Sequence, residues 1–171
     1  MEISYIISQI FVVMAMLSLG SSYLVKDKKI IMILCIICSL FYGVQYLLLG
    51  AISGMLMNLV GIIRDIWFYI NAKNNKKNNI IVLFVLIIIS ILFSIYSFNG
   101  IFSIIPLVAT ILFTYSVWQD NNKIYRYLAI PISILWIIYN VYIYSVFAII
   151  SECILLIIKI IGVIKLYKSK E

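Results

Sequence analysis

The chain has 171 residues, of which 65 % are hydrophobic and 11 % are charged, and its mean hydropathy is +1.19. A water-soluble globule of this length cannot bury so large an apolar fraction, so the composition excludes that class and indicates a membrane protein. The net charge of +7 lies in short clusters between hydrophobic stretches, which suits anionic lipid headgroups better than a phosphate backbone. We therefore expect a lipid bilayer as partner and no nucleic acid.

Catalytic and metal chemistry is not favoured by the residue types present. Histidine is absent, and the three cysteines lie in apolar runs. Imidazole metal sites, His-based nucleophile triads and disulfide scaffolds are therefore unpromising. Cys35 and Cys38 share a helical face, but no His or second cysteine pair completes a metal site. We predict no metal, no cofactor and no enzymatic activity.

Seven apolar segments predict an all-α membrane protein with seven transmembrane helices. A helix needs about 20 apolar residues to cross about 30 Å of hydrocarbon, because its backbone polar groups must be satisfied within the segment. The first segment has no basic residues before it and no cleavage pattern after it, so it is predicted to be a permanent helix. The predicted spans are roughly 3–25, 30–49, 53–72, 80–98, 101–118, 124–143 and 146–166.

The lysines and arginines in the loops and at the ends of the spans predict the orientation. They follow the first, third, fifth and seventh spans, whereas the turns after the second, fourth and sixth carry no charge. Because basic loops stay in the cytoplasm, the N-terminus is predicted outside and the C-terminus in the cytoplasm. The basic residues are Lys26, Lys28, Lys29, Lys73, Lys76, Lys77, Lys123, Arg126, Lys165, Lys168 and Lys170.

An offset of 94 residues overlays the first three spans on the last three without a gap. We therefore predict one transmembrane domain, 1–171, made of repeat one (1–72), a linker helix (80–98) and repeat two (101–171). Such 3+1+3 parallel repeats have a solute site at their interface near the bilayer midplane. The alternative is that any evenly spaced array of helices overlays itself. The offset pairs Ser22 with Ser116, Lys29 with Lys123, Ala51 with Ser145, Asn58 with Glu152 and Asp65 with Lys159.

Four ionisable side chains lie within the predicted spans, away from the span ends: Arg64, Asp65, Glu152 and Lys159. Such groups are costly in lipid, and their charges here sum to zero. We predict a cytoplasmic gate of Arg64, Asp65 and Lys159, in which Asp65 faces Lys159. Alternatively, Arg64 and Lys159 only extend to the headgroups. Glu152 lies too deep for that, so it is expected to be paired, for example with Arg64, or protonated.

Asn58, Trp136, Asn140 and Glu152 are the predicted solute-binding residues. Asn58 and Glu152 occupy equivalent positions of the two repeats, and Trp136 precedes Asn140 by about one turn. Their polar groups can bind a small polar solute, or they can join helix to helix as struts. The second use would make the chain a non-transporting accessory or assembly protein.

The pattern Trp136-x3-Asn140-x4-Ser145-x6-Glu152, with Leu47–Ala51 and Arg64, resembles the YgjV-type family of bacterial inner membrane proteins. That family is distantly similar to the MtN3/PQ-loop group, which includes the SWEET and PnuC transporters. The resemblance implies a 3+1+3 fold and transport of a small polar solute by alternating access. It also implies that Asn58 and Trp136 frame the solute, while Glu152 replaces the second Asn and Tyr42 replaces the first-repeat Trp. The identity of the solute, the coupling ion and whether the chain forms a homo-oligomer stay open.

Overall fold

The described residues form seven long α-helices and contain no strand. The computed structural model describes residues 2–22, 25, 27–119 and 121–168. The predicted helices are confirmed with boundaries that shift by a few residues, and the predicted end of the first, at 23–25, falls partly outside the described residues. The elements are α1 (Glu2–Ser22), α2 (Lys28–Leu48), α3 (Ile52–Lys73), α4 (Ile80–Tyr96), a 3-10 turn η1 (Ile101–Ile104), α5 (Ile105–Trp118), α6 (Asn122–Tyr142) and α7 (Val146–Lys168).

In the part of the chain that the structure describes, five helical segments are long and apolar enough to cross a membrane: those within α1, α2, α6 and α7, and the continuous segment formed by η1 and α5. The other two differ for separate reasons. Helix α4 has only 17 residues. In α3, which has 22 residues, the polar side chains of Asn58, Arg64 and Asp65 lower the mean hydropathy. The prediction of a multi-pass, all-helical membrane protein is therefore confirmed. Hydropathy and length alone do not identify α3 and α4 as membrane-spanning.

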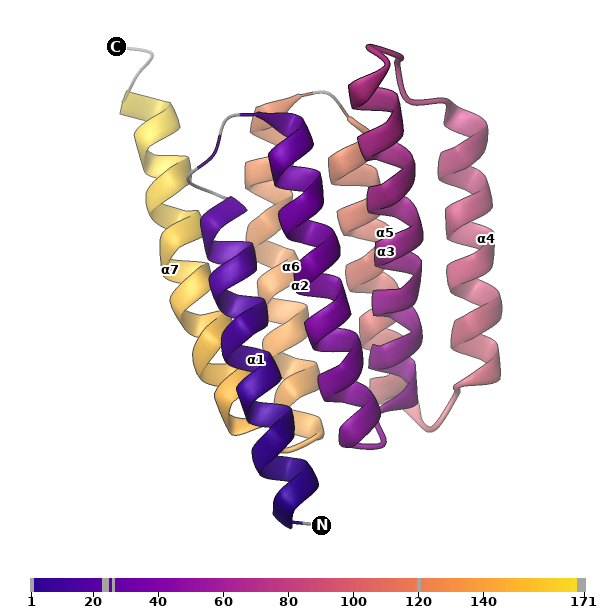
Figure 1. The fold of residues 1–171 in the computed structure, drawn as a ribbon, viewed down its shortest axis with the longest axis vertical. Helices are drawn as coiled ribbons and strands as arrows, with labels where there is room; N and C mark the ends of the chain where they lie inside the picture. The colour runs from indigo at the N-terminus through magenta and orange to yellow at the C-terminus, as the bar shows by residue number, and fades with distance from the viewer. Residues whose placement is uncertain (1, 23–24, 26, 120, 169–171) are drawn as a thin grey trace.

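Six of the helices form a closed ring, and α4 lies outside it (Figure 1). Around the ring, α1 packs on α2, α2 on α3, α3 on α5, α5 on α6, α6 on α7, and α7 again on α1. Helix α4 packs against α3 and α5. The two triplets α1–α3 and α5–α7 thus meet along two seams, α3 with α5 and α7 with α1, and they enclose a common interior.

The turns between α2 and α3 and between α6 and α7 are built alike. Gly50 and Tyr144, 94 residues apart, both have positive φ, at 69° and 55°. The backbone N–H groups of Leu49, Gly50, Ala51 and Met55 donate to the carbonyls of Gln45, Leu47, Tyr46 and Ala51. The same four bonds recur 94 residues later, from Ile143, Tyr144, Ser145 and Ile149 to Tyr139, Val141, Asn140 and Ser145.

The starts of α2 and α6 show the same correspondence. The side chain of Asp27 accepts a hydrogen bond from the N–H of Lys29, at 2.8 Å, and that of Asn121 accepts one from Lys123, at 3.0 Å. Both acceptors are N-cap residues, whose side-chain oxygens satisfy N–H groups that the helix leaves unpaired. These two caps also lie 94 residues apart.

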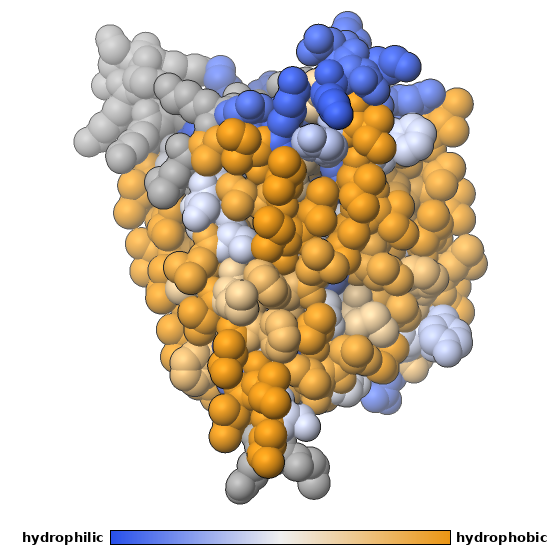
Figure 2. Space-filling view, in the orientation of Figure 1, coloured by the Kyte–Doolittle hydropathy of each residue, from blue (hydrophilic) through white to orange (hydrophobic). Residues whose placement is uncertain are grey.

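The outer surface is apolar over the flanks of the bundle and hydrophilic mainly at one end, the upper end in Figure 2. Large hydrophobic side chains are exposed along every long helix, whereas many buried side chains are polar or charged. This inversion suits a lipid solvent. The end that holds the α1–α2 and α3–α4 loops carries Lys28, Lys29, Lys73, Lys76 and Lys77. The predicted basic side chains of Lys26, Lys165, Lys168 and Lys170 lie outside the described residues.

Candidate functional site

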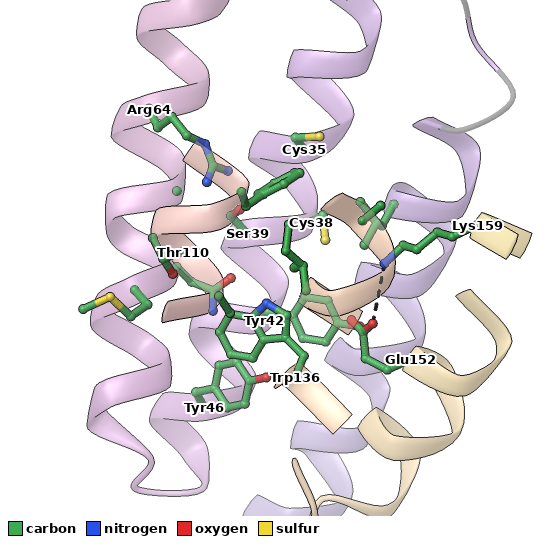
Figure 3. Close-up of a pocket in the computed structure, with 18 residues that line it drawn as sticks. Cys35, Cys38, Ser39, Tyr42, Tyr46, Arg64, Thr110, Trp136, Glu152 and Lys159 are labelled. Carbon is green, nitrogen blue, oxygen red and sulfur yellow. Dashed lines mark ion pairs between the residues drawn. The ribbon is translucent and has the colours of Figure 1, made fainter. Parts of the chain in front are cut away.

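A cavity of about 70 Å³ lies inside the ring of six helices, with room for a few water-sized molecules. Figure 3 shows Arg64 and Cys35 toward one end of it and Tyr46 and Trp136 toward the other. Both triplets contribute to the wall, and most of the lining residues come from α2, α3, α5 and α6. Polar lining residues are Cys35, Cys38, Ser39, Tyr42, Tyr46, Asn58, Arg64, Thr110, Trp136, Glu152 and Lys159; apolar ones are Leu19, Met57, Gly61, Ala109, Phe113, Ala129 and Ile132.

Arg64 and Asp65 form a bidentate ion pair in the wall of the cavity. The Arg64 Nε lies 2.7 Å from Asp65 Oδ1, and its Nη2 lies 2.9 Å from Oδ2. The guanidinium also covers the ring of Phe113 on α5, at 4.3 Å from the ring centroid. Arg64 is 2 % exposed and Asp65 is fully buried. A buried guanidinium held by a carboxylate and an aromatic face is a fixed part of the wall, because removing either charge would leave the other unpaired.

A second charged group joins Lys159, Ser133 and Glu152 between α6 and α7. Lys159 Nζ donates to the hydroxyl of Ser133, which in turn donates to Glu152 Oε2 at 2.9 Å. Nζ also lies 3.7 Å from Glu152 Oε2 (Figure 3). Glu152 and Lys159 are seven residues apart and so share a face of α7. The Ser133 hydroxyl therefore bridges the two charges, which both border the cavity.

Stacked aromatic rings close the end of the cavity near the α2–α3 turn. The rings of Tyr46 and Trp136 are stacked, with centroids 5.6 Å apart and an interplanar angle of 17°. Tyr42 also stacks on Tyr46, with centroids 6.1 Å apart, and Tyr139 contacts Tyr46 edge-on at 5.7 Å. Such a platform can hold a solute ring or an apolar sugar face against it.

Asn58 presents its amide to the same space from α3. Its Nδ2 donates to the carbonyl of Gly54, at 2.9 Å, one turn earlier on the helix. That bond fixes the amide orientation and leaves Oδ1 as an acceptor beside the cavity. Glu152 lies 94 residues later, on α7, so the two helices contribute oxygen acceptors from opposite triplets.

The structure brings five of the seven predicted site residues to the cavity wall: Asn58, Arg64, Trp136, Glu152 and Lys159. The other two, Asp65 and Asn140, are buried behind that wall. Asp65 reaches it only through Arg64. Asn140 Oδ1 accepts a hydrogen bond from the hydroxyl of Tyr46 at 3.0 Å, so it supports the aromatic platform. Its Nδ2 has no hydrogen-bond partner among the described residues.

The predicted contact between Asp65 and Lys159 is wrong. Both carboxylate oxygens of Asp65 are taken by Arg64, the next residue on the same helix, and Lys159 turns to Ser133 and Glu152 instead. Each acid thus finds its base on its own helix, where the distance is short. Lys159 is 6 % exposed, so neither it nor Arg64 extends to the headgroups.

Ser133, Tyr46 and Tyr139 are the site residues that the sequence analysis missed. A serine or tyrosine in an apolar span carries no charge and stands out in no hydropathy profile. The offset of 94 residues could have pointed to Ser133, because it pairs Ser133 with Ser39, which lines the cavity. The offset likewise relates Tyr46 to Asn140.

No described group of three His, Cys, Asp or Glu side chains could hold a metal ion. Cys35 and Cys38 are free thiols on the wall of the cavity, and Cys153 is exposed on the outer side of α7. The chemistry that the described site offers is therefore hydrogen bonding, ring stacking and fixed charge.

Comparison with known protein families identifies the family of the chain. The model of a family described as "Bacterial inner membrane protein", Imp-YgjV, matches residues 6–170. No curated protein and no solved structure matches the chain. With five helical segments able to span a bilayer, this assigns the protein to the bacterial inner membrane as a multi-pass protein. The chain belongs to the Imp-YgjV family of bacterial inner membrane proteins.

Proposed function

We propose that the protein is a transporter that moves a small polar solute across the inner membrane by alternating access. In this proposal all seven helices cross the bilayer, and the triplets α1–α3 and α5–α7 are parallel repeats joined by α4, as in SWEET-like proteins. The chain has no catalytic activity of its own. The two triplets rock against each other around a central solute site.

The observation that carries the proposal is the polar cavity between the two triplets. Its wall combines an aromatic platform, Tyr46 with Trp136, and acceptors from both halves, Asn58 and Glu152. Buried polar groups in a membrane protein are costly unless they have a partner or a use. A solute that stacks on the rings and hydrogen-bonds to both halves would link the two triplets directly.

The repeat is supported by the geometry of the turns and caps. Four turn hydrogen bonds and one N-cap bond recur at an offset of 94 residues, and the seam α3–α5 has its counterpart in α7–α1. A two-fold axis along the membrane normal would produce both regularities. An evenly spaced array without symmetry would not require bonds to correspond one by one.

The proposed orientation rests on the basic loops. The loops α1–α2, α3–α4 and α5–α6 lie at one end of the bundle (Figure 1), and that end carries the lysines in or next to these loops: Lys28, Lys29, Lys73, Lys76, Lys77 and Lys123. The positive-inside rule puts that end in the cytoplasm and the N-terminus outside.

A binding screen tests the proposal. Purified protein in detergent would be heated with a panel of sugars, nucleosides and vitamins, because a ligand at about 100 times its Kd stabilises by about 2.7 kcal/mol. At least one compound class should raise Tm. Asn58→Ala and Trp136→Ala should lose that shift, and Cys153→Ser, which changes an exposed side chain on α7, should keep it. A shift that survives Trp136→Ala would contradict a site at the aromatic platform.

A second candidate is a non-transporting accessory or assembly protein. The internal pairing of the charges favours it, because Arg64 with Asp65 and Glu152 with Lys159 are already partnered without a solute. In that case the cavity variants would change Tm in the absence of ligand, and no compound of the panel would bind.

A further inference from the structure

A second cavity opens at the opposite end of the bundle from the basic loops. It has a volume of about 630 Å³ and lies between the α2–α3 turn, the segment after α4, and the last turn of α6. We call it the vestibule. Its lining residues are Leu49, Gly50, Ala51, Ile52, Ser53, Tyr96, Ser97, Phe98, Asn99, Ser103, Tyr139, Tyr142 and Ile143.

One layer of aromatic rings lies between the vestibule and the central cavity. Tyr46 and Trp136 line the central cavity, and Tyr139 lines the vestibule. Tyr139 contacts both of the other rings edge-on, with centroids 5.7 Å from Tyr46 and 6.0 Å from Trp136. The two cavities are therefore separated at this point by little more than the thickness of these rings.

The hydroxyl of Tyr139 fastens this layer to the start of α3. It shares a hydrogen bond of 2.8 Å with Ser53 Oγ and accepts another of 3.1 Å from the backbone N–H of Gly54. That N–H is among the first of α3, which the helix itself cannot satisfy. Water in the vestibule could replace the hydroxyl at both partners, so the contact can open without leaving a buried polar group unpaired.

Gly54 has a close steric fit to the same layer. A Cβ at this position would lie 2.9 Å from Tyr139 Cε1 and 2.9 Å from Tyr46 Cγ. The absence of a side chain lets two rings pack directly on the backbone of α3. The layer is thus shaped by α2, α3 and α6, so a rocking motion of one triplet against the other would strain this contact.

We propose that Tyr46, Trp136 and Tyr139 form the barrier between the vestibule and the solute site, and that the Tyr139 contact with Ser53 and Gly54 is the latch that holds it shut. The vestibule is then the chamber through which solute reaches the central cavity. This inference rests on the proposed transport function.

The native thiols of Cys35 and Cys38 report on the barrier, because they line the central cavity behind it. The protein would carry Cys153→Ser to remove the exposed thiol. A membrane-impermeant methanethiosulfonate would be added to right-side-out and to inverted inner-membrane vesicles, which offer the two faces separately. The rate of labelling would be compared with that of Tyr139→Phe in the same background.

From the vestibule face, the parent protein should label slowly and Tyr139→Phe about tenfold faster, since two ordinary hydrogen bonds of the latch are lost. From the other face the two proteins should label equally. Tyr142→Phe is the matched control, because it removes a vestibule hydroxyl that takes no part in the latch, and it should not change either rate. Ser53→Ala, which deletes one hydrogen bond of the latch, should give a smaller increase in the vestibule-face labelling rate. It tests the latch if Tyr139→Phe does not fold.

The proposed barrier is contradicted if, from the vestibule face, the folded parent protein is labelled as fast as the same protein denatured in detergent. It is overturned equally if folded Tyr139→Phe and Ser53→Ala both leave the vestibule-face rate unchanged. A Tyr139-dependent barrier in a protein that carries no solute would overturn the transport function and leave the barrier standing.

Discussion

The hydroxyl of Tyr46 donates a 3.0 Å hydrogen bond to Asn140 Oδ1, and these two residues are 94 positions apart in the chain. The same offset relates the two tight turns and the two N-caps. Points related by a two-fold axis come within bonding distance only if both lie close to that axis. Under the proposed repeat, the axis therefore passes between α2 and α6 at the aromatic layer, beside the cavity.

Tyr46→Phe should lower the free energy of unfolding by about 1–3 kcal/mol, because it leaves the buried Asn140 Oδ1 without its donor. Thermal unfolding of the purified protein in detergent measures the effect. Tyr96→Phe is the control, because Tyr96 is 83 % exposed and its hydroxyl should matter little. Equal Tm values for both variants would show that the Tyr46–Asn140 bond adds nothing to stability.

Gly54→Ala should destabilise the protein by about 1–3 kcal/mol, as overpacking does where rigid rings cannot move aside. Gly20→Ala provides the comparison within α1, because its Cβ would meet only Leu155 Cδ2 at an ordinary 3.8 Å. That change should be neutral or stabilise by up to about 1 kcal/mol, since alanine favours helix over glycine. The prediction fails if the two alanine variants unfold at the same temperature.

Lys159→Met should cost about 3–5 kcal/mol, because it leaves the carboxylate of Glu152 buried beside Ser133 with no opposing charge. The double variant Glu152→Gln/Lys159→Met should be more stable than Lys159→Met alone. Lys76→Met, in an exposed loop, serves as the charge control. Additive losses in the double variant would mean that the two side chains do not interact.

A charge exchange between Asp65 and Lys159 should not rescue the protein. Asp65→Lys places a second cation beside the buried Arg64, and Lys159→Asp places a second carboxylate beside Glu152. The combined variant should therefore yield less folded protein than either single variant, measured as monodisperse protein by size-exclusion chromatography. Recovery of folded protein would contradict the observed pairing.

The helices were predictable because lipid imposes a simple requirement on sequence. Every span needs a long apolar run, and the breaks carry Lys, Asn or Gly, as at Gly50 and Gly100, which both have positive φ. Helix boundaries therefore follow from composition to within a few residues. The spacing of 94 residues followed from the same regular breaks.

The pairing of the charges was not predictable to the same degree. Position along a helix fixes the height and face of Asp65, but it does not fix where the flexible Arg64 side chain turns. That local partner was overlooked in favour of Lys159. The aromatic layer depends on three helices meeting at Gly54, and no single segment of sequence contains that contact.

Solute counterflow in proteoliposomes tests the central claim most directly. Vesicles preloaded with the compound that raises Tm would be diluted into a trace of its labelled form. The account predicts transient accumulation of label with the wild-type protein and with Cys153→Ser, and its loss with Trp136→Ala, whose ring forms the platform of the cavity. A stabilising compound that the wild type does not exchange, or equal exchange by Trp136→Ala, would contradict it.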